Sequence, residues 1–213
     1  VGRPRFDVVE GEGFIGSVAR GGAVNFTNVY FNPHGHGTHT ECLGHITKEA
    51  ESIHCIQLPL LIPCLLHTVS PANIQGDSVV TIEHLPGGGF TEEKLPKAMI
   101  LRTLPNGESK KSRDWANTNP TYLHSDFTDK LVERGVEHLL VDLPSVDKEI
   151  DGGTLLSHRA FFRVPEAPRT EATITEFVFI PNEVEDGLYA LNLQLAPFDL
   201  DASPSRPVIY PLS

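Results

Sequence analysis

Short runs of apolar residues recur along the chain, and they predict strands more often than helices. Residues 23–31, AVNFTNVYF, are rich in Val, Phe and Tyr with partial alternation, which predicts a strand. Three further runs, each bounded by Gly, Pro or Asp, are typical of buried strands: SVVTIEHL at 78–85, KAMILRTL at 97–104 and EHLLVDL at 137–143. The C-terminal part predicts three more strands, at 172–180, 187–196 and 206–212.

Two segments between these strands predict helices. Residues 125–135, SDFTDKLVERG, offer Ser125 or Thr128 as the N-cap and Gly135 as the terminating residue. Residues 155–162, LLSHRAFF, follow a Gly-rich turn and predict a short helix. Because no repeat or low-complexity linker divides the chain, we predict a single mixed α/β domain over residues 1–213, with more strand than helix.

The net charge of the chain limits its partners. The sequence has 213 residues with 17 basic and 28 acidic side chains, which gives a formal net charge of −11. A charge of this sign repels nucleic acid and anionic membrane surfaces, so we expect neither as a partner. A small-molecule substrate fits the composition better.

The sequence predicts neither a membrane span nor a disulfide framework. The longest apolar run, residues 56–69, is interrupted by two prolines and a histidine and is too short to cross a bilayer. Three cysteines are an odd number without paired spacing, so we expect a reducing compartment and a cytoplasmic protein. The chain begins at Val1 without an initiator Met or a signal-like apolar stretch, so we expect that native N-terminal residues are missing.

Histidines are concentrated in one short segment, NPHGHGTHTECLGHI at 32–46. Four of the ten histidines lie within the twelve residues from His34 to His45. Imidazole and carboxylate ligands suit Zn²⁺ or Mn²⁺, and three or four protein ligands with an open position are typical of a catalytic metal site. The segment therefore predicts a metal centre.

The spacing within this segment brings several side chains to one point. In extended backbone, side chains at positions i and i+2 point to the same side, so His39 and Glu41 can bind one metal ion. The adjacent glycines permit a bend that brings His34 or His36 to the same ion. A turn after Glu41 would place His45 beside it as well.

Other candidate ligands have a simpler interpretation. Strand alternation points Cys42 away from Glu41, which favours a buried structural cysteine. The isolated histidines are expected to have structural or surface roles. They are His54, His67, His84, His124 and His138.

The run HGTHTECLGH at 36–45 resembles the signature His-x-Gly-Thr-His-x-Asp-x-Pro-x-His of the cyclase-like metal-dependent hydrolases, the family that includes bacterial kynurenine formamidase and isatin hydrolase. Three further segments also resemble this family: RT at 102–103, VDLPSVD at 141–147, and SHRAFF followed by TITEFVF. The resemblance covers most of the chain. It implies a swivelling β/β/α type of α/β fold, a site with one or two Zn²⁺ or Mn²⁺ ions per chain, and a homodimer or homotetramer.

The resemblance also implies roles for individual residues. His39 matches a metal ligand and His45 matches the catalytic proton donor and acceptor. His158 aligns with a downstream metal-binding histidine, and Glu176 aligns with a carboxylate that can bind both ions of a two-metal site. Glu41 stands where the family has a bridging Asp, which is one methylene shorter.

The first histidine of the family signature has no direct counterpart, because Gly35 occupies its position. A neighbour must supply that ligand, and we expect His34 rather than His36 because the local glycines permit a bulge. Leu43 replaces the signature proline. The family uses an aromatic residue near its N-terminus for substrate contact, and no Trp precedes Trp115 here.

These observations lead to one main functional hypothesis and two alternatives. The main hypothesis is a kynurenine formamidase-like amidohydrolase, an arylformamidase, that cleaves an N-formyl arylamine such as N-formylkynurenine, or a cyclic amide. The first alternative keeps the site but hydrolyses a lactone or another ester. The second is a metal-dependent binding protein that recognises a small acid without turning it over.

Overall fold

The computed structural model describes residues 1–49, 51–87 and 94–212, and the chain divides into two compact units, Val1–Gly37 and Thr38–Ser213. The first unit contains His34 and His36, and the second contains the other predicted site residues. That residues 1–213 form a single domain stays a prediction.

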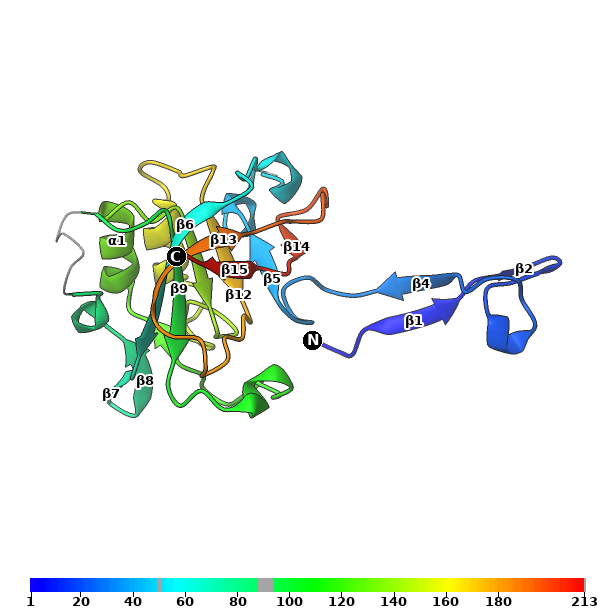
Figure 1. Ribbon diagram of the computed structural model, residues 1–213, viewed down its shortest axis with the longest axis horizontal. Helices are drawn as coiled ribbons and strands as arrows, with labels where there is room; N and C mark the ends of the chain where they lie inside the picture. The colour runs from blue at the N-terminus through cyan, green and yellow to red at the C-terminus, as the bar shows by residue number, and fades with distance from the viewer. Residues whose placement is uncertain (50, 88–93, 213) are drawn as a thin grey trace. The chain divides into compact units, whose positions relative to one another are not determined.

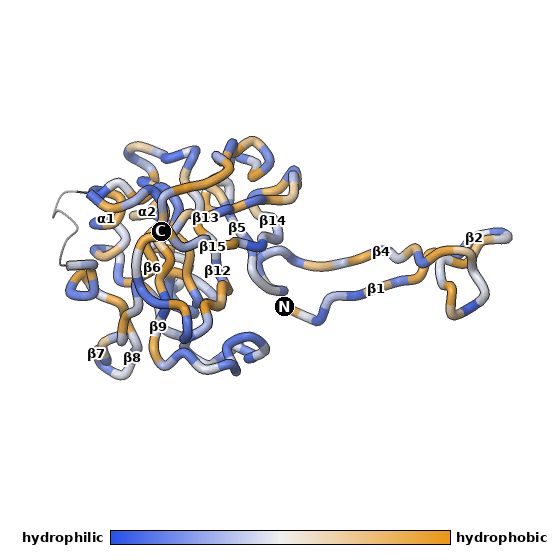
Figure 2. The backbone as a smooth tube through the Cα atoms, viewed as in Figure 1, coloured by the Kyte–Doolittle hydropathy of each residue, from blue (hydrophilic) through white to orange (hydrophobic). Residues whose placement is uncertain are grey.

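The unit Val1–Gly37 is built on a narrow β-ribbon. β1 (Arg5–Val8) pairs antiparallel with β4 (Thr27–Tyr30), and β2 (Glu10–Gly11) pairs with β3 (Phe14–Ile15). The strand predicted at 23–31 is therefore present but shorter than expected. A two-stranded ribbon offers no second layer, so its apolar side chains stay exposed. Figure 2 shows the hydropathy of the residues along this ribbon.

A sheet of eight strands forms the centre of the described part of Thr38–Ser213 (Figure 1). Its four inner strands run parallel and its outer strands pair antiparallel, which confirms the prediction of a mixed α/β, strand-rich domain. In spatial order the strands are β14 (Ala202–Pro204), β5 (His39–Glu41), β12 (Thr173–Glu176), β11 (His138–Val141), β9 (Ala98–Thr103), β6 (Ile62–Val69), β13 (Gly187–Asn192) and β15 (Val208–Pro211).

Each face of the sheet carries its own hydrophobic core, because side chains alternate along the inner strands. On β9, Met99 and Leu101 pack on the side of the helices α1 (Ser125–Glu133) and α2 (Leu156–Phe162). Ile100 points to the opposite face and packs with residues of the outer strands. Strand β6 lies within the apolar run 56–69, for which the sequence pattern had predicted no strand.

A small sheet, separate from the eight-stranded one, corrects one prediction. It contains β10 (Tyr122–Leu123), β8 (Asp77–Val80) and β7 (Ala72–Ile74). The strand predicted at 78–85 ends at Val80, because Thr81 and His84 form a reciprocal capping box that starts the 3₁₀-helix η4 (Ile82–His84). The other 3₁₀-helices in the described residues are η1 (Val18–Arg20), η2 (Leu43–His45), η3 (Ile53–Cys55) and η5 (Glu108–Lys111).

The predicted helices are present, with one correction at an N-cap. The ring of His124, rather than Ser125 or Thr128, caps α1 by accepting a hydrogen bond from the backbone of Asp126. Gly135 follows the helix at φ +90°, a left-handed conformation that glycine adopts readily. Within the described residues, no helix has the length and apolar character needed to cross a membrane.

Candidate metal centre

The antiparallel pairing of β5 with β12 brings two of the predicted ligands face to face. In this register His39 lies directly opposite Glu176. The His39 Nε2 atom is 3.5 Å from Glu176 Oε2 and 3.9 Å from Glu41 Oε2. His39 and Glu41 are fully buried, and Glu176 is 4% exposed. The expected i, i+2 relation of His39 and Glu41 is therefore present on the buried strand β5.

These three side chains fit a divalent cation. One ligand atom from each of His39, Glu41 and Glu176 can be chosen so that all three lie within 4.8 Å of one another. Burial, followed by the charge of Glu41, raises the pKa of the Glu176 carboxyl well above its usual value. Two buried carboxylates beside an imidazole form an oxygen and nitrogen donor set that suits a cation, which would offset their mutual repulsion.

Helix α2 adds His158 to this group. Its Nε2 atom lies 2.8 Å from Glu41 Oε1 and 3.9 Å from Glu176 Oε1. Burial by itself lowers the pKa of His158, but the carboxylates of Glu41 and Asp147 outweigh it, and the pKa is raised well above its usual value. The structure thus brings the two residues from the C-terminal half of the chain, His158 and Glu176, to the segment that carries His39 and Glu41.

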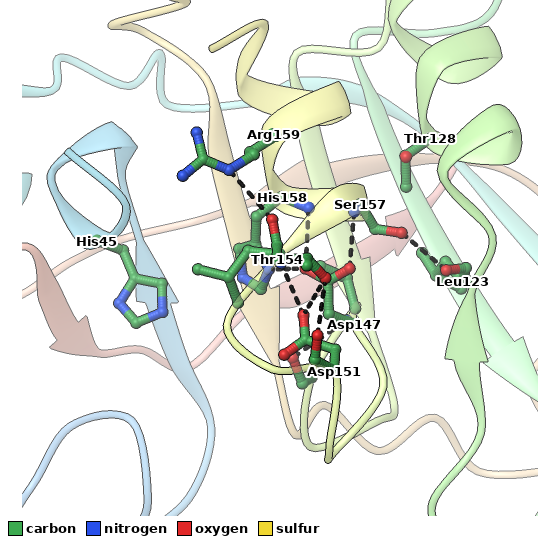
Figure 3. Close-up of polar contacts among 12 residues, drawn as sticks. His45, Leu123, Thr128, Asp147, Asp151, Thr154, Ser157, His158 and Arg159 are labelled. Atoms are coloured by element: carbon green, nitrogen blue, oxygen red, sulfur yellow. Dashed lines mark hydrogen bonds and ion pairs between the residues drawn. The ribbon is translucent and has the colours of Figure 1, made fainter. Parts of the chain in front are cut away.

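Asp147 is a further residue of the site that the sequence analysis did not single out. Its carboxylate accepts hydrogen bonds from the backbone N–H of Ser157 at 2.7 Å and of His158 at 3.1 Å, and it contacts His158 Nδ1 at 2.6 Å (Figure 3). Since an ionised carboxylate only accepts, this contact places a hydrogen on His158 Nδ1 and fixes the ring so that Nε2 faces Glu41. The signal was available, because Asp147 ends the segment VDLPSVD.

His45 reaches the same group from the other side. It ends η2, which supplies the turn expected after Glu41. Its Nε2 atom lies 3.7 Å from Glu41 Oε2, and its Nδ1 atom lies 3.1 Å from Asp201 Oδ2. The His45 side chain is 30% exposed, so it borders the buried ligands while remaining in contact with solvent.

The two histidines of the first unit differ in their local contacts. His36 Nδ1 accepts a hydrogen bond from the backbone N–H of Asn32 at 2.8 Å, and His36 Nε2 contacts the Gly2 carbonyl oxygen at 2.5 Å. Both ring nitrogens of His36 are therefore used within the unit. The choice of His34 over His36 as a ligand stays a prediction.

The cysteines lie outside the candidate ligand set. Cys42 is buried, and its thiol donates to the backbone carbonyl of Glu51 at 3.4 Å. Burial raises the pKa of the Cys42 thiol to about 11, so the thiolate that a metal would need is disfavoured. This agrees with the interpretation of Cys42 as a structural residue.

Comparison with known proteins identifies relatives by sequence. The model of the Cyclase family matches residues 4–148. A kynurenine formamidase from Bacillus cereus (strain ATCC 10987 / NRS 248) is 30% identical over 193 residues, which is 90% of this chain and 82% of that protein. A kynurenine formamidase from Bacillus mycoides (strain KBAB4) is 27% identical with the same coverage of both chains.

Solved structures share the fold at low sequence identity. An isatin hydrolase bound to the product analogue thioisatinate superposes with a TM-score of 0.66 at 10% identity, covering 97% of this chain and 80% of that one. A protein from Bacillus stearothermophilus that is described as a predicted metal-dependent hydrolase superposes with a TM-score of 0.65 at 15% identity, covering 97% of this chain and 86% of that one. These similarities establish the fold of the chain.

Proposed function

Because the chain belongs to the Cyclase family, we propose that it is a metal-dependent hydrolase that cleaves an amide bond. The observation that carries the proposal is the buried group of His39, Glu41 and Glu176, with the partly exposed His45 beside it. Buried ligands hold an ion firmly, and a solvent-accessible imidazole next to them can exchange protons with substrate and water.

The proposed substrates are aryl amides. Relatives are named kynurenine formamidase, and structural neighbours include isatin hydrolases. N-formylkynurenine is an N-formyl arylamine and isatin is a cyclic aryl amide, so both names describe cleavage of a C–N bond to an aromatic amine. We propose that this chain acts as an arylformamidase or on a related cyclic amide.

Each residue of the site has a distinct role in this proposal. His39, Glu41 and Glu176 would hold the ion together with His158. Zn²⁺ or Mn²⁺ held there would supply Lewis acidity, which activates water for attack at neutral pH. His45 Nε2 accepts a proton from the attacking water and returns it to the leaving nitrogen as the C–N bond breaks, giving a carboxylic acid and an amine.

Metal content per chain tests the first half of the proposal. We expect one or two Zn²⁺ or Mn²⁺ ions in purified protein by plasma mass spectrometry, and their loss in His39→Ala. The control is His54→Ala, because His54 is an exposed histidine that contacts Ser52 and Asp199 rather than the ligand group. Wild-type protein that contains no such ion and takes none up on incubation would contradict the proposal.

A substrate panel tests the second half. N-formylkynurenine, isatin and an aryl lactone are offered to the metal-loaded protein, and product is followed by liquid chromatography. We expect turnover of an amide. Faster turnover of the lactone would instead support ester hydrolysis with the same site, and tight binding without product over hours would support a small-acid binding protein.

We also propose that the chain forms a homodimer or homotetramer. The ribbon of the first unit exposes large apolar side chains, among them Phe6 at 64% and Val29 at 53%. Burying such side chains against another protein surface is favourable, and a second copy of the chain is always present. Light scattering on a sizing column should give twice or four times the mass of one chain, and the mass of a single chain would contradict this part.

A further inference from the structure

The ring of His45 has a carboxylate partner that lies 156 residues further along the chain. His45 Nδ1 is 3.1 Å from Asp201 Oδ2, while His45 Nε2 faces Glu41 Oε2 at 3.7 Å. We propose that Asp201 is a positioning residue, which keeps the ring hydrogen of His45 on Nδ1 and so presents the basic Nε2 to the candidate metal centre. This inference rests on the proposed function, because it specifies how His45 performs its part.

The backbone of Asp201 is fixed by the same strand that carries two of the ligands. β14 pairs antiparallel with β5, so that Ala202 lies opposite Glu41. The carbonyl of Asp201 accepts the backbone N–H of Cys42 at 2.9 Å, and the carbonyl of Leu200 accepts that of Ile53 at 2.7 Å. Asp201 therefore lies immediately before β14, and hydrogen bonds hold both its own carbonyl and that of Leu200.

His45 is held just as closely to this strand edge. Its backbone N–H donates to the Cys42 carbonyl at 3.0 Å, which closes the turn after β5. Gly44 permits the close approach of the segments involved, because a Cβ atom there would lie 2.1 Å from the carbonyl oxygen of Glu51 and 3.3 Å from Asp201 Cβ. The imidazole and the carboxylate thus project from two backbone segments whose separation is set by β-sheet hydrogen bonds.

The chemistry of this pair follows from its atoms. An ionised carboxylate only accepts hydrogen bonds, so a close contact requires the imidazole to donate from Nδ1. The neutral ring then carries its lone pair on Nε2, which a general base needs in order to accept a proton. Both side chains are about one third exposed, so water competes for them, and the fixed carboxylate is what favours one tautomer and one ring orientation.

The tautomer of His45 can be measured without metal or substrate. In metal-free protein labelled with ¹⁵N-histidine, two-bond ¹⁵N–¹H correlation spectra show which ring nitrogen carries the hydrogen, at a pH where the ring is neutral. We expect Nδ1–H in the wild type, a shift towards Nε2–H in Asp201→Ala, and recovery of Nδ1–H in Asp201→Glu. The matched control is Asp199→Ala, because Asp199 lies two residues away and its exposed carboxylate faces His54 instead.

Turnover and metal content complete the test. We expect kcat of Asp201→Ala to fall about 10- to 100-fold, with KM and metal content unchanged and partial rescue in Asp201→Glu. An Nε2–H tautomer in the wild type, an unchanged tautomer in Asp201→Ala, or equal loss of activity in Asp199→Ala would overturn the inference. A wild type without any turnover would contradict the proposed function instead, and the spectra of the metal-free protein would still decide the role of Asp201.

Discussion

Two histidine–carboxylate pairs border the candidate metal centre, and they differ in burial. In the pair His158–Asp147, the side chains are 2% and 7% exposed and the contact is 2.6 Å. In the pair His45–Asp201, the side chains are 30% and 33% exposed and the contact is 3.1 Å. The first pair belongs to a helix N-terminus and a loop, and the second to a turn and the start of an edge strand.

The difference indicates two uses of the same chemistry. A buried imidazole fixed by a carboxylate that also binds two backbone N–H groups has little freedom, which suits a ligand. An imidazole that is 30% exposed keeps a route to solvent, which suits proton transfer. Burial therefore distinguishes the histidine that suits ion binding from the histidine that suits proton transfer, although both histidines face Glu41.

Replacing each histidine by alanine should separate these uses most clearly. We expect His158→Ala to lose metal and activity together, because it removes a buried ligand. We expect His45→Ala to keep its metal while kcat falls about 10²- to 10⁴-fold, the usual contribution of general acid–base catalysis. Equal loss of metal in both variants would show that His45 is only a ligand. The two histidines would then not differ in function.

Replacing the buried carboxylate should have the largest effect on stability. Asp147→Ala leaves the backbone N–H groups of Ser157 and His158 and the ring of His158 without their acceptor in a buried site. We expect a loss of about 3–5 kcal/mol in the free energy of unfolding, measured by urea denaturation of metal-free protein.

The control for this experiment is Asp129→Ala, which breaks an exposed ion pair with Arg163. We expect that variant to change the free energy of unfolding by less than about 1 kcal/mol. If Asp147→Ala lowered the free energy of unfolding no more than Asp129→Ala does, the buried pair would contribute no more to stability than an exposed ion pair.

A third buried histidine sharpens the comparison because its partner is a hydroxyl. His138 Nδ1 contacts Thr173 Oγ1 at 2.9 Å, and burial lowers the pKa of His138 to about 4. Between pH 6.5 and pH 4 the unfolded chain binds more protons here than the folded one, so this contribution is complete above pH 6.5 and is lost as the pH falls towards 4.

Integrated over that window, the contribution amounts to as much as about 3 kcal/mol. We expect the free energy of unfolding of His138→Gln to fall less steeply with acid than that of the wild type. Parallel pH profiles for the two proteins would show that His138 is protonated without cost in the folded state.

The exposed pair should contribute least to stability. Asp201→Ala removes a carboxylate that is one third exposed, so we expect a change of less than about 1 kcal/mol in the free energy of unfolding. Urea denaturation measured beside Asp147→Ala provides the contrast. A loss as large as that of Asp147→Ala would mean that Asp201 acts mainly in holding β14 to β5.

Local patterns predicted much of the fold and part of the candidate site. The spacing of His39 and Glu41 predicted a shared direction on extended backbone, and β5 supplies it. The apolar runs at 97–104 and 137–143 predicted the inner strands β9 and β11. These predictions succeeded because each depends on alternation within one segment.

Predictions failed where the backbone departs from regular alternation. Strict alternation along the strand predicted at 172–180 would place Ile174, Glu176 and Val178 on one face, but Val178 packs in the core of the opposite face from Ile174. The cause is Phe177, whose φ of +56° ends β12 and reverses the direction of the next side chain. No local pattern in this segment signals such a conformation at a phenylalanine.

Local sequence patterns could not predict contacts between residues that lie far apart in the chain. Asp147 and Asp201 are single carboxylates in loops, and only the packing of α2 on the sheet and the pairing of β14 with β5 bring them to their histidines. The resemblance supplied His158 and Glu176 because their segments carry motifs, whereas no motif marks the residues around Asp201.

The position of β5 between β12 and β14 has a consequence for biosynthesis. Contacts on these strand pairs join residues far apart in the chain, such as Thr40 and Thr175, which are separated by 135 positions. A nascent chain that has exposed the segment 34–45 still lacks the partners of β5 until almost the whole sequence has left the ribosome. We therefore expect ion capture to be one of the last steps of maturation, after the inner strands have assembled.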